Sequence, residues 1–125
     1  MALLLYTENV QSLAPLIDGL ADKQRHIRLV STESELRRLL DTPAVEAVIA
    51  EDSNLELMKS IIEDYPLYNY ALISPRSEKD FHTVTEGYGF FMQIPDSPKE
   101  KDAQALLDKL DEITSFTATR GGVRK

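Results

Sequence analysis

The sequence contains no cysteine and two histidines, His26 and His82. Without cysteine the chain forms no disulfide, holds no thiolate zinc site and offers no cysteine nucleophile. Two histidines are too few for a convincing histidine-based metal site, and we expect His82 to be a surface side chain. These absences exclude thiol enzymes and the common classes of zinc protein.

Long apolar runs are also missing, since none approaches the roughly 20 residues that a membrane-spanning helix needs. The start, MALLLYTEN, has no basic segment, and its apolar run is too short for a secretory signal peptide. Positive charge is scarce: 14 Lys and Arg stand against 21 Asp and Glu, for a net charge of -7. We therefore expect a cytoplasmic protein that binds neither a membrane nor nucleic acid.

Sequence features of enzymes and nucleotide binders are weak. The segment TENVQS follows the first apolar run, where a nucleotide-binding fold would carry a glycine-rich phosphate loop. No serine or acid–base set with a plausible histidine partner emerges, so hydrolase chemistry is unsupported. We expect a protein that is not an enzyme.

The 125 residues, 42% of them hydrophobic, suit one domain with its own core. Short apolar runs alternate with stretches of helical period. Strands are expected at residues 2–6, 26–30, around 47–50, 70–73 and 90–94. Helices are expected at residues 10–21, 33–40, 54–64, 77–86 and 99–116. This alternation predicts an α/β fold with a doubly wound, five-stranded parallel sheet.

Polar side chains follow two of these runs directly. Glu51 and Asp52 come after the run 47–50, and Ser74 follows the run 70–73. In open α/β sheets, ligand sites lie just past the carboxyl ends of the strands. The sequence therefore places its candidate site at Glu51, Asp52 and Ser74.

Three local motifs resemble response-regulator receiver (CheY-like) domains. The segment GYGFFMQIPDSP resembles the GAxDYLxKPxxP of receivers around strand five, and VEAVIAE stands where receivers read DLVLLD. The segment ALISP stands where receivers end strand four on Thr or Ser. Over residues 2–116 the chain thus resembles a receiver. The resemblance implies a (βα)5 flavodoxin-like fold with strand order 2-1-3-4-5.

The resemblance also assigns positions at the receiver site. The phosphoacceptor position is occupied by Glu51, or by Asp52 if the register slips by one. Thr7 and Glu8 occupy the positions of the acidic pair, and Ser74 and Phe91 those of the two switch residues. Ile94 stands where receivers have a lysine. Replacing the lysine removes a cation, and reducing the acidic pair weakens a Mg²⁺ site. We therefore expect a degenerate receiver, or pseudo-receiver, with no metal, no cofactor and no ordinary aspartyl phosphorylation.

Each position also has an ordinary structural interpretation. Glu51 and Asp52 are a relic acceptor site, a fixed-charge switch or a solvated strand end. Ser74 is a switch residue or a helix cap, and Phe91 is a rotating aromatic or an ordinary edge-strand one. We expect Glu51, Ser74 and Ile94 to converge at the carboxyl edge. Because the site has little positive charge, Glu51 should face solvent or accept backbone N–H groups of the following helix.

The leading hypothesis is a stand-alone receiver-like domain in bacterial signalling that acts through a protein partner, a histidine kinase or an output protein. Receivers use helix four, strand five and helix five as a contact face, which implies partner binding or a homodimer there. The first alternative is a phosphoaccepting two-component response regulator of a phosphorelay with atypical site residues. The second is a small-molecule binding module on the same fold. We expect the domain at residues 1–117 and a flexible basic tail at 118–125.

Overall fold

The computed structural model describes residues 2–8, 10–21, 26–42 and 45–124, with side chains in these ranges up to residue 113. Five parallel strands form one sheet in the order β2-β1-β3-β4-β5. The strands are β1 (Ala2–Tyr6), β2 (His26–Val30), β3 (Val45–Glu51), β4 (Asn69–Ser74) and β5 (Phe90–Pro95). The α-helices are α1 (Ala14–Leu20), α2 (Glu33–Leu40), α3 (Leu55–Asp64), α4 (Glu78–Thr85) and α5 (Glu100–Arg124). The predicted fold class and strand order are confirmed.

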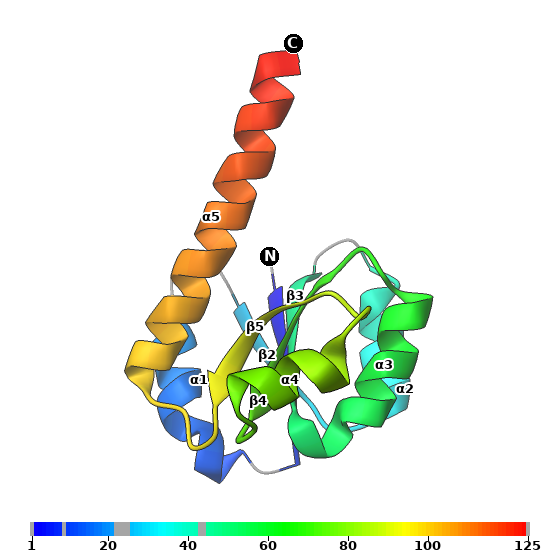
Figure 1. Ribbon diagram of the computed structural model, residues 1–125, viewed down its shortest axis with the longest axis vertical. Coiled ribbons are helices and arrows are strands. Elements are labelled where there is room, and N and C mark those ends of the chain that lie inside the picture. Colours follow the sequence, from blue (N-terminus) through cyan, green and yellow to red (C-terminus); the bar gives the residue numbers. More distant parts are fainter. Residues whose placement is uncertain (1, 9, 22–25, 43–44, 125) are drawn as a thin grey trace.

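Helices cover both faces of the sheet, with α1 and α5 on one side and α2 and α3 on the other (Figure 1). Because side chains of a strand alternate between faces, the buried residues divide into two clusters. One cluster joins Leu4, Val48 and Leu72 to the helices α2, α3 and α4, and the other joins Leu5, Ile49 and Ile73 to α1 and α5. Strands buried on both faces explain the continuous apolar runs of the sequence.

The first helix is shorter than its apolar period predicts. A 3₁₀ turn, η1 (Gln11–Leu13), precedes α1, which has Pro15 in its first turn. The ring of Pro15 would clash with the carbonyl of Gln11 in a regular α-helix starting at residue 10. The α-helix therefore begins at Ala14, where the missing N–H of proline removes no helical hydrogen bond.

The last helix is longer than predicted. The sequence places its end at residue 116, but α5 continues to Arg124 and projects beyond the body of the domain (Figure 1). No proline interrupts residues 99–124, so the backbone hydrogen bonds continue although Gly121 and Gly122 favour the helix weakly. The predicted helix end is wrong, and the division into a domain at 1–117 and a tail at 118–125 stays a prediction.

Candidate functional site

The predicted site residues meet at the carboxyl edge of the sheet. In register, Glu51 of β3 lies beside Ile73 of β4, and Ile73 lies beside Ile94 of β5. Ser74, the last residue of β4, pairs with Pro95. The expected convergence of Glu51, Ser74 and Ile94 is therefore confirmed.

Glu51 is held by the neighbouring strand end. The hydroxyl of Thr7, which directly follows β1, donates a hydrogen bond of 2.5 Å to Oε1 of Glu51. Thr7 is buried and Glu51 half-buried, whereas Glu8 is exposed. Glu51 is also the N-cap residue of the 3₁₀ turn η2 (Asp52–Asn54), where its side chain makes no capping hydrogen bond. Of the two expected arrangements, the one with backbone N–H groups is wrong, because the Thr7 hydroxyl is the donor. The solvent-facing one holds in part, since Glu51 is half-buried.

Asp52 carries the densest set of contacts at this edge. Its Oδ2 accepts from the Ser74 hydroxyl at 2.6 Å and from Nε of Arg76 at 2.8 Å. Its Oδ1 accepts from Nη2 of Arg76 at 3.1 Å, which completes a bidentate ion pair. The Ser74 oxygen in turn accepts from the backbone N–H of Arg76 at 3.2 Å. Asp52, Ser74 and Arg76 thus form a closed ring of hydrogen bonds, which we call the Asp52 ring.

Electrostatics favours the charged form of both ionic members of the ring. The hydrogen bond from Arg76 and then that from Ser74 lower the pKa of the Asp52 carboxyl, against the opposing effect of partial burial. The hydrogen bond to Asp52, together with the negative charge of Asp52, raises the pKa of Arg76. Asp52 is the better shielded partner, with 18% of its side chain exposed against 37% for Arg76. Both partners of the ion pair are therefore charged at neutral pH.

On the β5 side of the site, Gln93 binds the backbone of the loop that follows β4. The side-chain amide of Gln93 donates to the backbone oxygens of Ser74 at 3.3 Å and of Arg76 at 2.8 Å. The segment Ser74–Arg76 is thus held by Asp52 of the turn after β3 and by Gln93 of β5. This arrangement leaves the Ser74 hydroxyl engaged on both sides, as donor to Asp52 and acceptor from Arg76.

The strand-five positions do not supply a cation. Ile94 is fully buried and belongs to the cluster under α1 and α5. Phe91 is half-buried against the same cluster, at a register shift between the pairs Tyr70–Phe90 and Ala71–Met92. The bulge explains why Phe91 and Met92 pack on one side although they are consecutive. The switch role predicted for Phe91 stays a prediction.

The residues present do not fit a magnesium ion. Within residues 2–8, 10–21, 26–42 and 45–113, no three Asp, Glu or His side chains are grouped to hold a metal. Magnesium prefers carboxylate oxygens in octahedral geometry. Here the Thr7 hydroxyl donates to Glu51, and Arg76 donates to both carboxylate oxygens of Asp52.

Two shallow cavities open at this edge. One, of about 430 Å³, is lined by Ser74, Pro75, Arg76, Gln93, Pro95 and Asp96. The other, of about 310 Å³, is lined by Glu51, Asp52, Ser53, Ile73, Pro75 and Asp96. Both therefore border the Asp52 ring.

Sequence reasoning missed Arg76 and Gln93. Because Ile94 stands at the lysine position, the sequence predicts a site with little positive charge. The structure corrects this, because Arg76 brings a guanidinium to the site from the loop after β4. The signal was visible in the segment ALISPR, where an arginine follows Ser74 by two residues.

Comparisons with known proteins agree on the fold. No family model matches the chain, and no curated protein matches it. A solved structure of an atypical orphan response regulator, described as having a phosphorylation-independent regulatory mechanism, matches with a TM-score of 0.70 and 18% identity. The match covers 89% of this chain and 96% of that one.

Two further structures match as well. An orphan response regulator of H. pylori has a TM-score of 0.70 and 17% identity over 88% of this chain and 96% of its own. A CheY-like receiver domain protein of Methanospirillum hungatei has a TM-score of 0.73 and 12% identity over 92% and 97%. Together with the strand order, these matches show that the chain has the fold of response-regulator receiver domains.

Proposed function

We propose that the chain is a receiver-like signalling domain that acts by contact with a protein partner, without enzymatic activity and without ordinary aspartyl phosphorylation. The observation that carries this proposal is the Asp52 ring. The Ser74 hydroxyl and both carboxylate oxygens of Asp52 are already bonded within the chain. A switch driven by phosphorylation needs the Ser74 hydroxyl free to bind a new phosphoryl oxygen, and in the slipped register it also needs a free Asp52 carboxylate to receive the phosphoryl group.

Two other positions support the same function. Phosphoryl transfer to a carboxylate requires positive charge to stabilise the charge that develops on the phosphoryl oxygens. Ile94 supplies none, and the guanidinium of Arg76 is neutralised by Asp52. Glu51 is bonded to Thr7 rather than to a cation. The reported mechanism of the orphan regulator named above, which needs no phosphorylation, makes this a reasonable mode for the fold.

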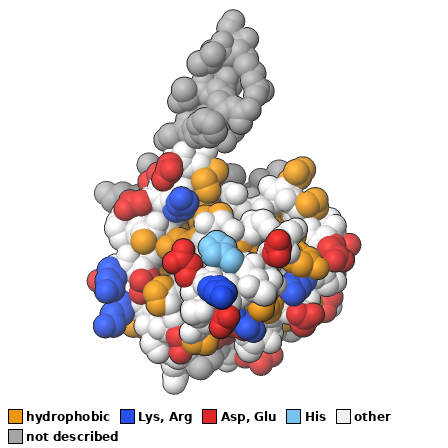
Figure 2. Space-filling model, in the orientation of Figure 1, with side chains coloured by type: hydrophobic (Ala, Val, Ile, Leu, Met, Phe, Trp, Pro, Cys, Tyr) orange, Lys and Arg blue, Asp and Glu red, His pale blue; other side chains and the backbone are white. Residues whose placement is uncertain are grey.

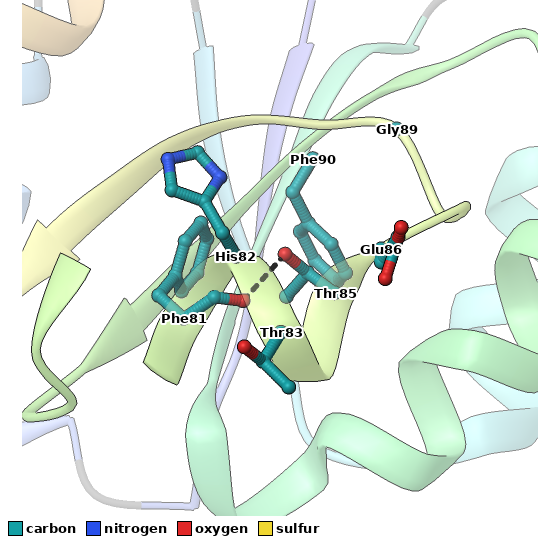
Figure 3. Close-up of a pocket in the computed structure, with 7 residues that line it drawn as sticks. All are labelled: Phe81, His82, Thr83, Thr85, Glu86, Gly89 and Phe90. Atoms are coloured by element: carbon teal, nitrogen blue, oxygen red, sulfur yellow. Dashed lines mark hydrogen bonds between the residues drawn. The ribbon is translucent and has the colours of Figure 1, made fainter. Parts of the chain in front are cut away.

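We place the partner contact at α4 and β5, with the adjoining surface of α5. A cavity of about 450 Å³ lies between α4 and the start of β5, where Phe81, His82 and Phe90 line it (Figure 3). A second cavity, of about 280 Å³, continues along residues 90–93 of β5. Half-buried apolar side chains on an edge strand are the type of surface that partners cover.

Surface charge supports a protein partner over nucleic acid. On the face drawn in Figure 2, Lys and Arg side chains are interspersed with acidic ones rather than gathered into one patch. None of the helices in the described part of the chain combines the length and apolarity needed to cross a membrane. A histidine kinase or an output protein is the partner class that we propose.

Intact-mass measurement tests the phosphorylation part of the proposal. The protein is incubated with acetyl phosphate and Mg²⁺, and we expect its mass to remain unchanged. A gain of one phosphoryl group that Asp52→Asn or Glu51→Gln abolishes would contradict the proposal. That result would favour the alternative, a phosphoaccepting regulator with atypical site residues.

The partner face is tested with a matched pair of charge changes. His82 is exposed and lines both cavities, whereas Arg28 is exposed on β2 at the opposite edge of the sheet. We expect His82→Glu to weaken binding to purified candidate partners encoded beside this gene, and Arg28→Glu to leave it unchanged. Equal effects of both variants would contradict the placement. Sedimentation of the same two variants tests a homodimer through this face.

A further inference from the structure

The fourth helix is weakly anchored to the sheet. Among its eight residues, the buried side chains are Phe81 and Thr85. Phe81 meets Phe90 of β5 edge to face, with ring centroids 6.3 Å apart. The hydroxyl of Thr85 is used within the helix, where it donates to the backbone oxygen of Phe81 (Figure 3). A short helix with few buried apolar contacts opens at low free-energy cost unless something else holds it.

The Asp52 ring lies directly at the start of this helix. Arg76 is followed by Ser77, the N-cap residue of α4, whose hydroxyl accepts from the backbone N–H of Asp80 at 3.2 Å. The backbone N–H of Phe81 donates to the backbone carbonyl oxygen of Ser77 at 2.8 Å. The position of Arg76 therefore sets where the first turn of α4 begins, and through it where Phe81 meets the sheet.

We propose that the Asp52 ring is a conformational latch: while Arg76 is bound to Asp52, α4 stays docked on β5, and when the pair separates, α4 is released. The latch requires no covalent modification, because its two states differ in whether one ion pair is formed. Opening frees the guanidinium of Arg76 and the positions that it occupied on both Asp52 oxygens, whereas the bond from the Ser74 hydroxyl to Asp52 does not involve the Arg76 side chain. Opening also changes the surface formed by α4 and β5.

Geometry explains why one ion pair can act on a whole helix. Asp52 lies in the turn after β3, which is buried on both faces, so its backbone is a fixed point. Arg76 lies in the exposed loop after β4, outside the buried strands. Two parallel N–H···O bonds fix its orientation as well as its distance. Gln93 holds the same loop from β5 through two backbone oxygens, so the loop is fixed between two strands.

Hydrogen exchange of the whole chain, followed residue by residue, tests the latch. In Arg76→Gln the charge and the bidentate bonds are lost, and in Asp52→Asn the charge is lost while a side-chain acceptor for Ser74 remains. We expect amides of α4, beginning with Phe81, to exchange about tenfold faster or more in both variants. Amides of β1 and of the first turns of α5 should keep their wild-type rates. Arg76→Lys, which keeps the positive charge but cannot form the two parallel hydrogen bonds of a guanidinium, should give an intermediate exchange rate.

Arg37 provides the matched control. It bridges Glu33 at 2.8 Å and Asp64 at 2.6 Å on α2 and α3, with 29% of its side chain exposed. Arg37→Gln removes a comparable pair and should leave the exchange of α4 unchanged. Unchanged α4 exchange in the Arg76 and Asp52 variants would overturn the latch. So would an equal rise in every element, or an equal opening of α4 by Arg37→Gln.

This inference goes beyond the proposed function and does not depend on it. The exchange measurement uses the protein without a partner and without a phosphoryl donor. A failed latch would therefore leave the mass measurement on acetyl phosphate to decide the proposed function by itself.

Discussion

The hydroxyl of Thr7 donates a hydrogen bond of 2.5 Å to Oε1 of Glu51, and this bond joins the ends of the central strands β1 and β3. We expect Thr7→Val, which keeps the shape of the side chain, to lower the free energy of unfolding by about 1 kcal/mol. The loss is limited because the half-buried Glu51 can rebind water. Denaturant unfolding measures it. The control is Thr83→Val on the exposed surface of α4, which should change stability by less than about 0.5 kcal/mol.

The two carboxylates of the site should differ in how far their influence extends. Glu51 is bonded to Thr7, away from the loop after β4, so Glu51→Ala should shift NMR signals near β1 and β3. Asp52 contacts Ser74 and Arg76, so Asp52→Asn should also shift the signals of α4 and β5. Large shifts at Phe91 and in α5 on Glu51→Ala would show that Glu51 itself holds a switch.

Acid should remove the contribution of Asp52 to stability. Its pKa in the folded protein lies below the ordinary value of 3.8, so its stabilisation is fully present above that value. The stabilisation is lost as the pH falls through the lowered pKa. The difference in free energy of unfolding between wild type and Asp52→Asn should therefore be constant near neutral pH and shrink below about pH 4. A difference that grows on acidification would reverse the sign and contradict the ion pair.

The helices α1 and α5 approach at Gly19. A Cβ atom added there would lie 2.6 Å from the Cβ of Ala103 and 3.2 Å from the backbone of Glu100. Gly19→Ala should therefore destabilise the protein by about 1–3 kcal/mol, despite the better helix propensity of alanine. The double variant Gly19→Ala/Ala103→Gly should show a favourable coupling energy in a double-mutant cycle, because it removes the closer of these contacts. If the changes in free energy of unfolding of the two single variants simply added, the close contact between α1 and α5 at Gly19 would be contradicted.

Much of the fold is predictable from the sequence because buried parallel strands are short and apolar. The runs around Val48 and Leu72 have no charge, and each ends in polar residues, which fixes strand ends within a residue or two. The helix termini are less predictable. Pro15 moved the start of α1, and the end of α5 depends on weak propensities rather than on a stop signal.

The site was only partly predictable for a different reason. Strand register places Glu51, Ser74 and Ile94, because parallel strand ends meet at one edge. The partner of Asp52 depends on the path of the loop after β4, which brings Arg76 back over the end of β3. No local pattern encodes that path. The donor to Glu51 is the hydroxyl of Thr7. The resemblance to receivers predicts carboxylates at this position and gives no reason to expect a hydroxyl donor.

We propose that the chain's own side chains close the carboxyl edge, so that it does not respond to a phosphoryl donor. NMR spectra recorded before and after addition of acetyl phosphate and Mg²⁺ test it most directly. We predict unchanged amide signals for Glu51, Asp52, Ser74 and the residues of α4. Signals of Ser74 and α4 that shift together, and return after the donor is removed, would contradict the account.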